Sequence, residues 1–286
     1  MVKMDKLKEL VKVVLYSGYV QDEAPINLLI VGTPESGKSS LINRIVTNEG
    51  LIEVTDISAW GLAKMIYPLI DEGKTITHIL IPDFLVVLAK SKTTAKRTLT
   101  FLNSIVEEGI VNIGTYLNKG IKFKTSQEMK EKRITCGVIT AMTEKAYSKK
   151  KKQFNEIGFL SRFLVVRYKY SSGYLQNIFK SIKEGNYLHK ESEQMIFPKE
   201  KIAIKYVDSE THNILCLIAK EKVASGNVDA YGIRLSKMLK TFLKAIALKN
   251  GRKKVIKQDW KEFLSYIPLI NYSGRNIETI DEEKLK

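Results

Sequence analysis

The chain has 286 residues, 44% of them hydrophobic, and a formal net charge of +16 at pH 7. This length and apolar content suffice for one large domain or two moderate ones, and no apolar run is long enough to span a membrane. The two cysteines, Cys136 and Cys216, and the three histidines are too few and scattered for a disulfide framework or a metal site, so we expect buried free thiols and a cytoplasmic protein.

The positive charge suits a polyanionic partner, of which nucleic acid is the usual one. A lysine-rich composition also serves solubility or growth in a warm habitat, so the charge alone leaves both interpretations open. The positions of the lysines along the chain therefore have to decide between them.

A phosphate-binding motif follows the first predicted strand. Residues 4–17 have helical apolar spacing, residues 27–31 form an apolar run, and residues 40–46 continue as a second helix. The octapeptide between strand and helix matches G-x-x-x-x-G-K-[ST] in full. Its glycines let backbone N–H groups turn inward around phosphate oxygens, its lysine can reach the β and γ phosphates, and the serine hydroxyl after it can ligate Mg²⁺. We predict a nucleoside triphosphate site formed by Gly32, Thr33, Pro34, Glu35, Ser36, Gly37, Lys38, Ser39 and Ser40.

Beyond this motif, strands and helices alternate. The predicted strands cover residues 51–55, 76–81, 134–143 and 164–168, and the predicted helices between them cover 59–70 and 93–108. The strands are nearly continuous apolar runs, as expected of buried parallel strands. This order predicts a doubly wound α/β core with a five-stranded parallel sheet.

The third predicted strand ends in a single acidic residue, Asp83, between Pro82 and Phe84. In this layout an acid at the carboxyl end of the strand faces the Mg²⁺ ion. P-loop ATPases of this layout usually have two adjacent acids, one near the metal and one activating water. The simpler alternative is that Asp83 only begins a turn after Pro82.

Residues 110–124 read as a β-hairpin around an Asn-Lys-Gly turn, with Lys119, Lys122 and Lys124 at its tip and on its second arm. Such a hairpin can project toward the phosphate backbone of DNA. The alternative is an ordinary edge hairpin that its lysines protect from aggregation.

Helical patterns dominate after residue 170, with a polar stretch at 184–200 as the clearest boundary. We therefore divide the chain into an N-terminal helix (1–20), an α/β nucleotide-binding core (21–170) and a small helical domain with a charged, frayed tail (171–286).

The arrangement resembles an AAA+ ATPase, and several stretches resemble the motor domain of minichromosome maintenance (MCM) helicases. Residues 159–163, Phe-Leu-Ser-Arg-Phe, are similar to the Leu-Leu-Ser-Arg-Phe stretch of that family. Residues 102–113 with the hairpin after them resemble its helix and pre-sensor hairpin, and residues 233–242 and 255–259 resemble its lid helices.

This resemblance implies a ring, hexamer-like in size, with Mg·ATP bound between subunits and DNA in the channel. Arg162 would reach the γ-phosphate of the neighbouring subunit, Arg234 would be the sensor-2 arginine, and Thr143 would take the sensor-1 position, where the family usually has Asn. Ser39 and Asp83 would hold the metal, and Lys38 the phosphates.

The chain departs from the family in two ways. Either Asp83 is the metal ligand and Phe84 replaces the water-activating Glu, or Asp83 replaces that Glu and Pro82 replaces the metal-binding Asp. Loss of a positioned base typically lowers a rate 10²- to 10⁴-fold. The second departure is that we expect no counterpart of the family's N-terminal domain, so a partner protein could supply DNA binding.

Three functions therefore remain open. The first is an ATP-driven motor or helicase-like component acting on DNA. The second is a nucleotide-gated assembly or loading module with weak or no hydrolysis, and the third is a remodeller of a protein partner.

Overall fold

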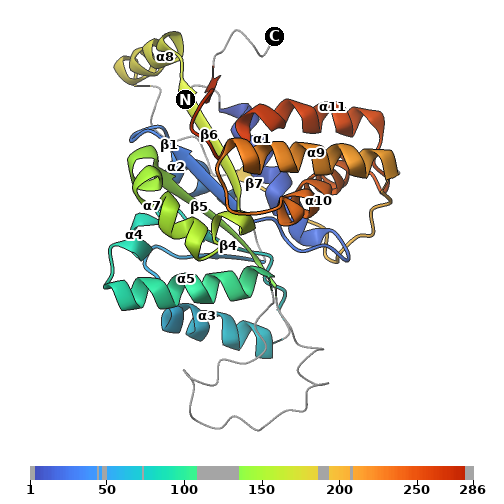
Figure 1. The fold of residues 1–286 in the computed structure, drawn as a ribbon, viewed down its shortest axis with the longest axis horizontal. Helices are drawn as coiled ribbons and strands as arrows, with labels where there is room; N and C mark the ends of the chain where they lie inside the picture. Colours follow the sequence, from blue (N-terminus) through green and yellow to red (C-terminus); the bar gives the residue numbers. More distant parts are fainter. Residues whose placement is uncertain are drawn as a thin grey trace.

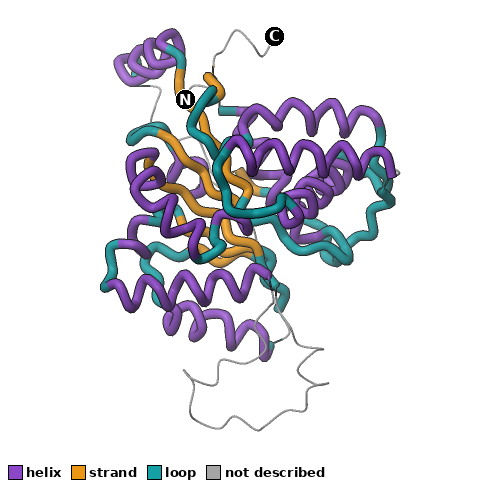
Figure 2. Tube along the Cα trace, viewed as in Figure 1, coloured by secondary structure: helices purple, strands orange, loops and turns teal. Residues whose placement is uncertain are grey.

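The computed structural model describes residues 4–43, 45–46, 50–72, 74–107, 135–185, 193–206 and 209–280. A six-stranded sheet runs through the middle of the molecule, with helices packed around it (Figures 1 and 2). In order across the sheet, the strands are β3 (Leu51–Glu53), β4 (His78–Ile81), β5 (Gly137–Thr143), β1 (Leu28–Gly32), β6 (Leu164–Tyr170) and β8 (Glu278–Ile280). Neighbouring strands are parallel throughout, so the predicted α/β class with a parallel sheet is confirmed.

The central strands are apolar because helices cover both of their faces. Every residue of β1 and of β4 is buried, which explains why these segments lack polar alternation. β1 lies between β5 and β6, and its last residue, Gly32, is paired with Thr143 at the end of β5. The carboxyl ends of β1, β4 and β5 therefore lie at one edge of the sheet.

The number of strands differs from the predicted five. The sixth strand, β8, comes from the charged C-terminal segment and pairs with β6 through Tyr168 opposite Glu278 and Tyr170 opposite Ile280. The pairing protects the otherwise open edge of β6. A three-residue strand with partly exposed side chains has too little apolar pattern to be recognised in the sequence.

The helix after the phosphate loop is shorter than the predicted one. α2 covers Lys38–Asn43, and the β-branched pair Ile45–Val46 forms a separate short strand, β2. β2 pairs in parallel with β7 (Glu193–Gln194), which lies in the polar stretch 184–200.

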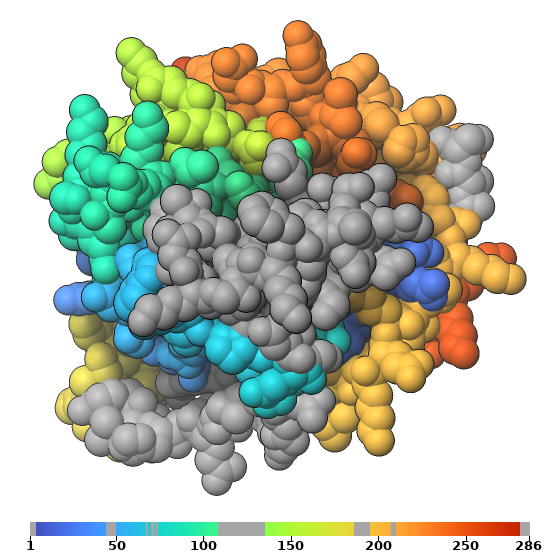
Figure 3. All heavy atoms as spheres, turned by 90° about the horizontal axis from the view of Figure 1, so that it is seen from below, coloured from blue at the N-terminus to red at the C-terminus, as the bar shows by residue number. Residues whose placement is uncertain are grey.

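The remaining described helices are α1 (Asp5–Tyr16), α3 (Ala59–Asp71), α4 (Leu85–Leu88), α5 (Lys92–Glu107), α7 (Glu144–Glu156), α8 (Ser172–Lys183), α9 (Ser209–Ser225), α10 (Ile233–Lys249) and α11 (Lys257–Tyr266), with 3₁₀ turns η1 (Ser17–Tyr19), η2 (Leu160–Arg162) and η3 (Ile267–Leu269). α9, α10 and α11 form a helical group beside the sheet, whereas α3 and α5 lie together at the far side of the molecule (Figure 1). Figure 3 shows the face on which α3 and α5 lie, with the helical group at its opposite margin.

The N-terminal helix packs on this helical group. α1 contacts α10, and Lys249 near the end of α10 forms ion pairs with Glu9 of α1, at 2.9 Å, and with Glu262 of α11, at 2.7 Å. Burial lowers the pKa of Lys249, but its hydrogen bonds and ion pairs with the two glutamates outweigh burial and raise this pKa overall. The first helix and the helices of the C-terminal segment therefore form one packed unit.

The thiol of Cys136 is buried, whereas Cys216 is partly exposed, contrary to our expectation for the second cysteine. Burial raises the pKa of the Cys136 thiol to about 12, so this group stays protonated. None of the helices in the described part of the chain combines the length and apolar character that a membrane crossing requires.

Candidate nucleotide-binding site

The predicted phosphate loop leaves β1 at the carboxyl edge of the sheet. Thr33, Pro34 and Glu35 form its exposed tip, whereas Ser36 is buried. Glu35 has a φ of 61° and Gly37 a φ of 77°, both in the left-handed region. Glycine adopts this conformation without a steric penalty, which explains the second glycine of the motif. The two left-handed residues turn the backbone around Ser36.

Two tyrosines of β6 hold the phosphate loop through hydrogen bonds to its backbone. The hydroxyl of Tyr168 donates to the Ser36 carbonyl at 2.7 Å, and the hydroxyl of Tyr170 donates to the same oxygen. Burial raises the pKa of Tyr170 to about 12 and that of Tyr168 further, so both hydroxyls remain donors. Met4, just before α1, contacts the Tyr170 hydroxyl through its sulfur at 3.3 Å. This support was not predicted from the sequence, although residues 168 and 170 alternate onto one face of a strand next to β1.

Lys38 is buried at the start of α2, and its ammonium group folds back onto the loop. It donates to the Thr33 carbonyl and to the Ser36 hydroxyl, the latter at 3.1 Å. Burial lowers the pKa of Lys38, and the nearby charge of Asp83 acts in the opposite direction. The lysine is thus held by acceptors in the same loop, and Asp83 is close enough to act on it electrostatically.

The loop after β4 brings one carboxylate to this edge. Asp83 is exposed and accepts a hydrogen bond from the Leu85 amide at 2.9 Å. The hydroxyl of Ser39 donates to the Pro82 carbonyl at 3.1 Å, one residue before Asp83. An exposed hydroxyl and an exposed carboxylate are the hard oxygen ligands that Mg²⁺ prefers, so Ser39 and Asp83 fit a metal bound at this edge.

Phe84 points away from the site and into the core. Its ring is fully buried, with ring centroids 5.3 Å from Phe159 and 6.2 Å from Phe154. A carboxylate at this position would be buried among aromatic rings without a partner. Position 84 therefore holds a core residue, whichever of the two predicted alignments of Asp83 applies.

Thr143 ends β5 at the same edge, beside Gly32. Its hydroxyl accepts a hydrogen bond from the Ala146 amide at 3.3 Å and caps α7. The hydroxyl hydrogen stays free to be donated elsewhere, because capping uses only a lone pair of the oxygen. The phosphate loop, Asp83 and Thr143 therefore all lie at the carboxyl edge of the sheet.

The two predicted arginines lie at the opposite, amino edge of the sheet. Arg162 ends η2 just before β6, and its carbonyl accepts a hydrogen bond at 2.8 Å from Asn27, which precedes β1. The five-residue strand β1 separates Asn27 from the phosphate loop by about 16 Å. Arg162 therefore cannot reach a phosphate bound in the loop of its own chain.

Arg162 and Arg234 share one carboxylate, that of Glu107 at the end of α5. Glu107 Oε2 is 2.6 Å from Nε and from Nη2 of Arg162, and Glu107 Oε1 accepts from Nε of Arg234. Burial raises the pKa of Glu107, but the hydrogen bond from Arg234 and the charges of both arginines outweigh burial and lower this pKa overall. Glu107 was not predicted as a site residue, because nothing in the sequence distinguishes it from the adjacent Glu108.

The hairpin lysines, Lys119, Lys122 and Lys124, and the hairpin itself lie outside the described residues. No protein-family model matches the chain, and no curated protein matches it in sequence.

Proposed function

We propose that this protein is an MCM-like AAA+ ATPase, which binds Mg·ATP at the carboxyl edge of its sheet, between subunits of a ring, and acts on DNA. The observation that carries the proposal is the phosphate loop: two left-handed residues around a buried Ser36, with Lys38 and Ser39 directly after them. Backbone N–H groups in such a loop, together with a lysine, form a cradle for the β and γ phosphates. The choice of adenine over guanine, and of the MCM type among AAA+ ATPases, rests on the family resemblance.

The position of the arginines supports binding between subunits. Arg162 and Arg234 lie about one strand length from the loop of their own chain, so they could contact a γ-phosphate only on another copy. A guanidinium supplied in this way stabilises charge on the transferring phosphoryl group. Ser39 and Asp83 would hold the Mg²⁺, which neutralises charge on the phosphates, and Thr143 would donate to the attacking water.

Action on DNA rests on the net charge of +16 and on the predicted basic hairpin. Lysines that neutralise phosphates make binding strongly dependent on salt. Changing Lys119, Lys122 and Lys124 together to Glu should therefore abolish salt-sensitive DNA binding, measured by fluorescence anisotropy at two salt concentrations. Unchanged binding would contradict this part of the proposal.

A mixing experiment tests the shared site. The Lys38→Ala and Arg162→Ala proteins should each hydrolyse little ATP, whereas their mixture should hydrolyse more than either alone, because an intact loop then meets an intact arginine. Lys96→Ala, on the exposed side of α5, is the matched control and should behave as the wild type. Wild-type turnover by both single variants would refute the proposal, and no gain on mixing would refute the shared site.

A second function, nucleotide-gated assembly with little or no turnover, is favoured by the site around β4. In the described segment formed by β4 and residues 82–84, Asp83 is the single acid, and the next residue, Phe84, is buried in the aromatic core. Tight Mg·ATP binding without turnover, with and without DNA, would favour this function over the motor. Turnover stimulated by DNA and abolished in Asp83→Asn would favour the motor, and stimulation only by a protein would indicate a remodeller.

A further inference from the structure

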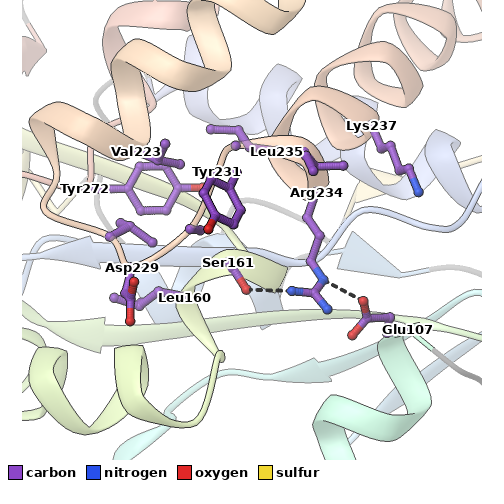
Figure 4. A pocket seen from close by; sticks show the side chains of 14 residues that line it. Glu107, Leu160, Ser161, Val223, Asp229, Tyr231, Arg234, Leu235, Lys237 and Tyr272 are labelled. Atoms are coloured by element: carbon purple, nitrogen blue, oxygen red, sulfur yellow. Dashed lines mark hydrogen bonds and ion pairs between the residues drawn. The ribbon is translucent and has the colours of Figure 1, made fainter.

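A cavity of about 670 Å³ lies beside the shared carboxylate, between η2, the turn that precedes α10 and the C-terminal segment (Figure 4). This volume is within the usual range for small-molecule sites. Arg234 and Lys237 line it, as do Glu107 and Ser161, whereas Arg162 does not. In Figure 4 the Arg234 side chain extends from the start of α10 toward Ser161 and Glu107, at the margin of the cavity.

Arg162 is fully engaged with its own subunit. Its Nε and Nη2 are both 2.6 Å from Glu107, its Nη1 donates to the Gly158 carbonyl at 2.6 Å, and only 18% of the side chain is exposed. Arg234 is freer, with 45% of its side chain exposed and a longer contact of 3.4 Å to the Ser161 hydroxyl. Arg162 is thus directed inward, whereas Arg234 is partly accessible.

The Glu107 carboxylate makes the contacts that a phosphate would make. Guanidinium groups bind carboxylates and phosphates through the same fork of N–H donors, so the two anions compete for the same arginines. One carboxylate shared by two guanidinium groups leaves a net positive charge on the cluster. A terminal phosphate carries more negative charge and more acceptor oxygens than this carboxylate and can therefore displace it.

The rim of the cavity is unusually exposed and apolar. Tyr231 is 88% exposed and Ile233 is 61% exposed, and both lie within three residues before Arg234 in the chain. Exposed aromatic and aliphatic side chains next to an arginine are typical of a protein interface. This surface therefore fits another protein surface that carries an anion, as the nucleotide-bearing edge of a second copy would.

We propose that Glu107 is an internal competitor for the triphosphate of a second copy, holding Arg162 and Arg234 on their own subunit until that triphosphate displaces its carboxylate. This inference rests on the proposed function, because the second copy must carry the nucleotide. Glu107 then limits assembly without nucleotide: the arginines are released only where a phosphate can replace the carboxylate.

Binding of tripolyphosphate by isolated subunits tests the competition without requiring assembly. In a Lys38→Ala background, which removes the phosphate-loop contribution, Glu107→Gln should bind tripolyphosphate at least tenfold more tightly by calorimetry. The gain should disappear when Arg162 and Arg234 are also changed to Ala. Glu156→Gln, which removes an exposed carboxylate, is the matched control and should bind as its parent does.

Unchanged or weaker tripolyphosphate binding by a folded Glu107→Gln variant, as judged by circular dichroism, would overturn the proposal, because Glu107 would then only orient the arginines. With Lys38 intact, Glu107→Gln should also assemble with Mg·ATP at a lower protein concentration than the wild type in sedimentation velocity. Failure of both proteins to assemble, with the tripolyphosphate result as expected, would overturn the proposed ring but not the competition.

Discussion

The support of the phosphate loop by two tyrosines can be measured by a double-mutant cycle. Tyr168 and Tyr170 both donate to the Ser36 carbonyl, and Ser36 is buried. In Tyr168→Phe or Tyr170→Phe the carbonyl keeps one partner, so each single change should lower the free energy of unfolding by about 1 kcal/mol, the net contribution of one neutral hydrogen bond. Removing the second donor also leaves a buried acceptor without a partner, which costs about 1–3 kcal/mol.

The double variant should therefore lose about 3 kcal/mol, at least about 1 kcal/mol more than the sum of the two single changes. Urea unfolding of the four proteins, with equal slopes, measures this difference. Tyr16→Phe is the control, because its hydroxyl donates to the Ile196 carbonyl in an exposed position, and it should change stability by less than about 0.5 kcal/mol. Additivity of the two changes within about 0.3–0.5 kcal/mol would refute a shared acceptor.

Three further predictions concern stability and the missing acid. Glu23→Gln should lower the free energy of unfolding by about 3 kcal/mol at pH 7, because Glu23 is largely buried between Lys240 and Lys244. Burial raises the pKa of Glu23, but hydrogen bonds from both lysines outweigh burial and lower this pKa below 4.5. The difference in unfolding free energy between wild type and variant should therefore be full above pH 4.5 and shrink as the pH falls below it. A difference in unfolding free energy that does not depend on pH would contradict this prediction. Phe84→Glu should lower the free energy of unfolding by more than about 3 kcal/mol without a gain in ATP turnover, because it buries an unpaired carboxylate among aromatic rings. A variant that is as stable as the wild type and hydrolyses ATP faster would contradict the assignment of Phe84 to the core. Gly37→Ala should lose about 1–2 kcal/mol in thermal unfolding because of its left-handed φ, and an unchanged melting temperature would show that the loop adopts another conformation.

The parts of the fold that follow from local pattern could be predicted from the sequence. The apolar runs at β1 and β4 and the motif that follows β1 predicted the parallel sheet, because buried parallel strands need no alternation. β8 could not be predicted, since a three-residue edge strand is defined by its partner β6 and not by its own side chains. β2 is similar: two β-branched residues at the end of a helical pattern became a strand because β7 pairs with them.

In the candidate site, too, the residues of a continuous motif could be predicted, whereas those brought together by the fold could not. Lys38 and Ser39 lie in a continuous motif, so their positions followed from spacing alone. The role of Glu107 depends on three segments that meet only in the fold, α5, η2 and the start of α10. The direction of Phe84, into the aromatic core and away from the site, depended on Phe154 and Phe159 in the same way.

The packing of α1 on α10 has a consequence for the synthesis of the chain. Lys249, which holds α1 through Glu9, follows it by 240 residues. The apolar side of α1, including Leu7, Leu10 and Val14, therefore lacks its contacts with α10 until α10 has left the ribosome. Nascent chains should expose this helix for most of translation, which makes it a binding site for chaperones that recognise apolar segments. Folding of this protein is thus completed after translation of α10, although the phosphate loop is made early.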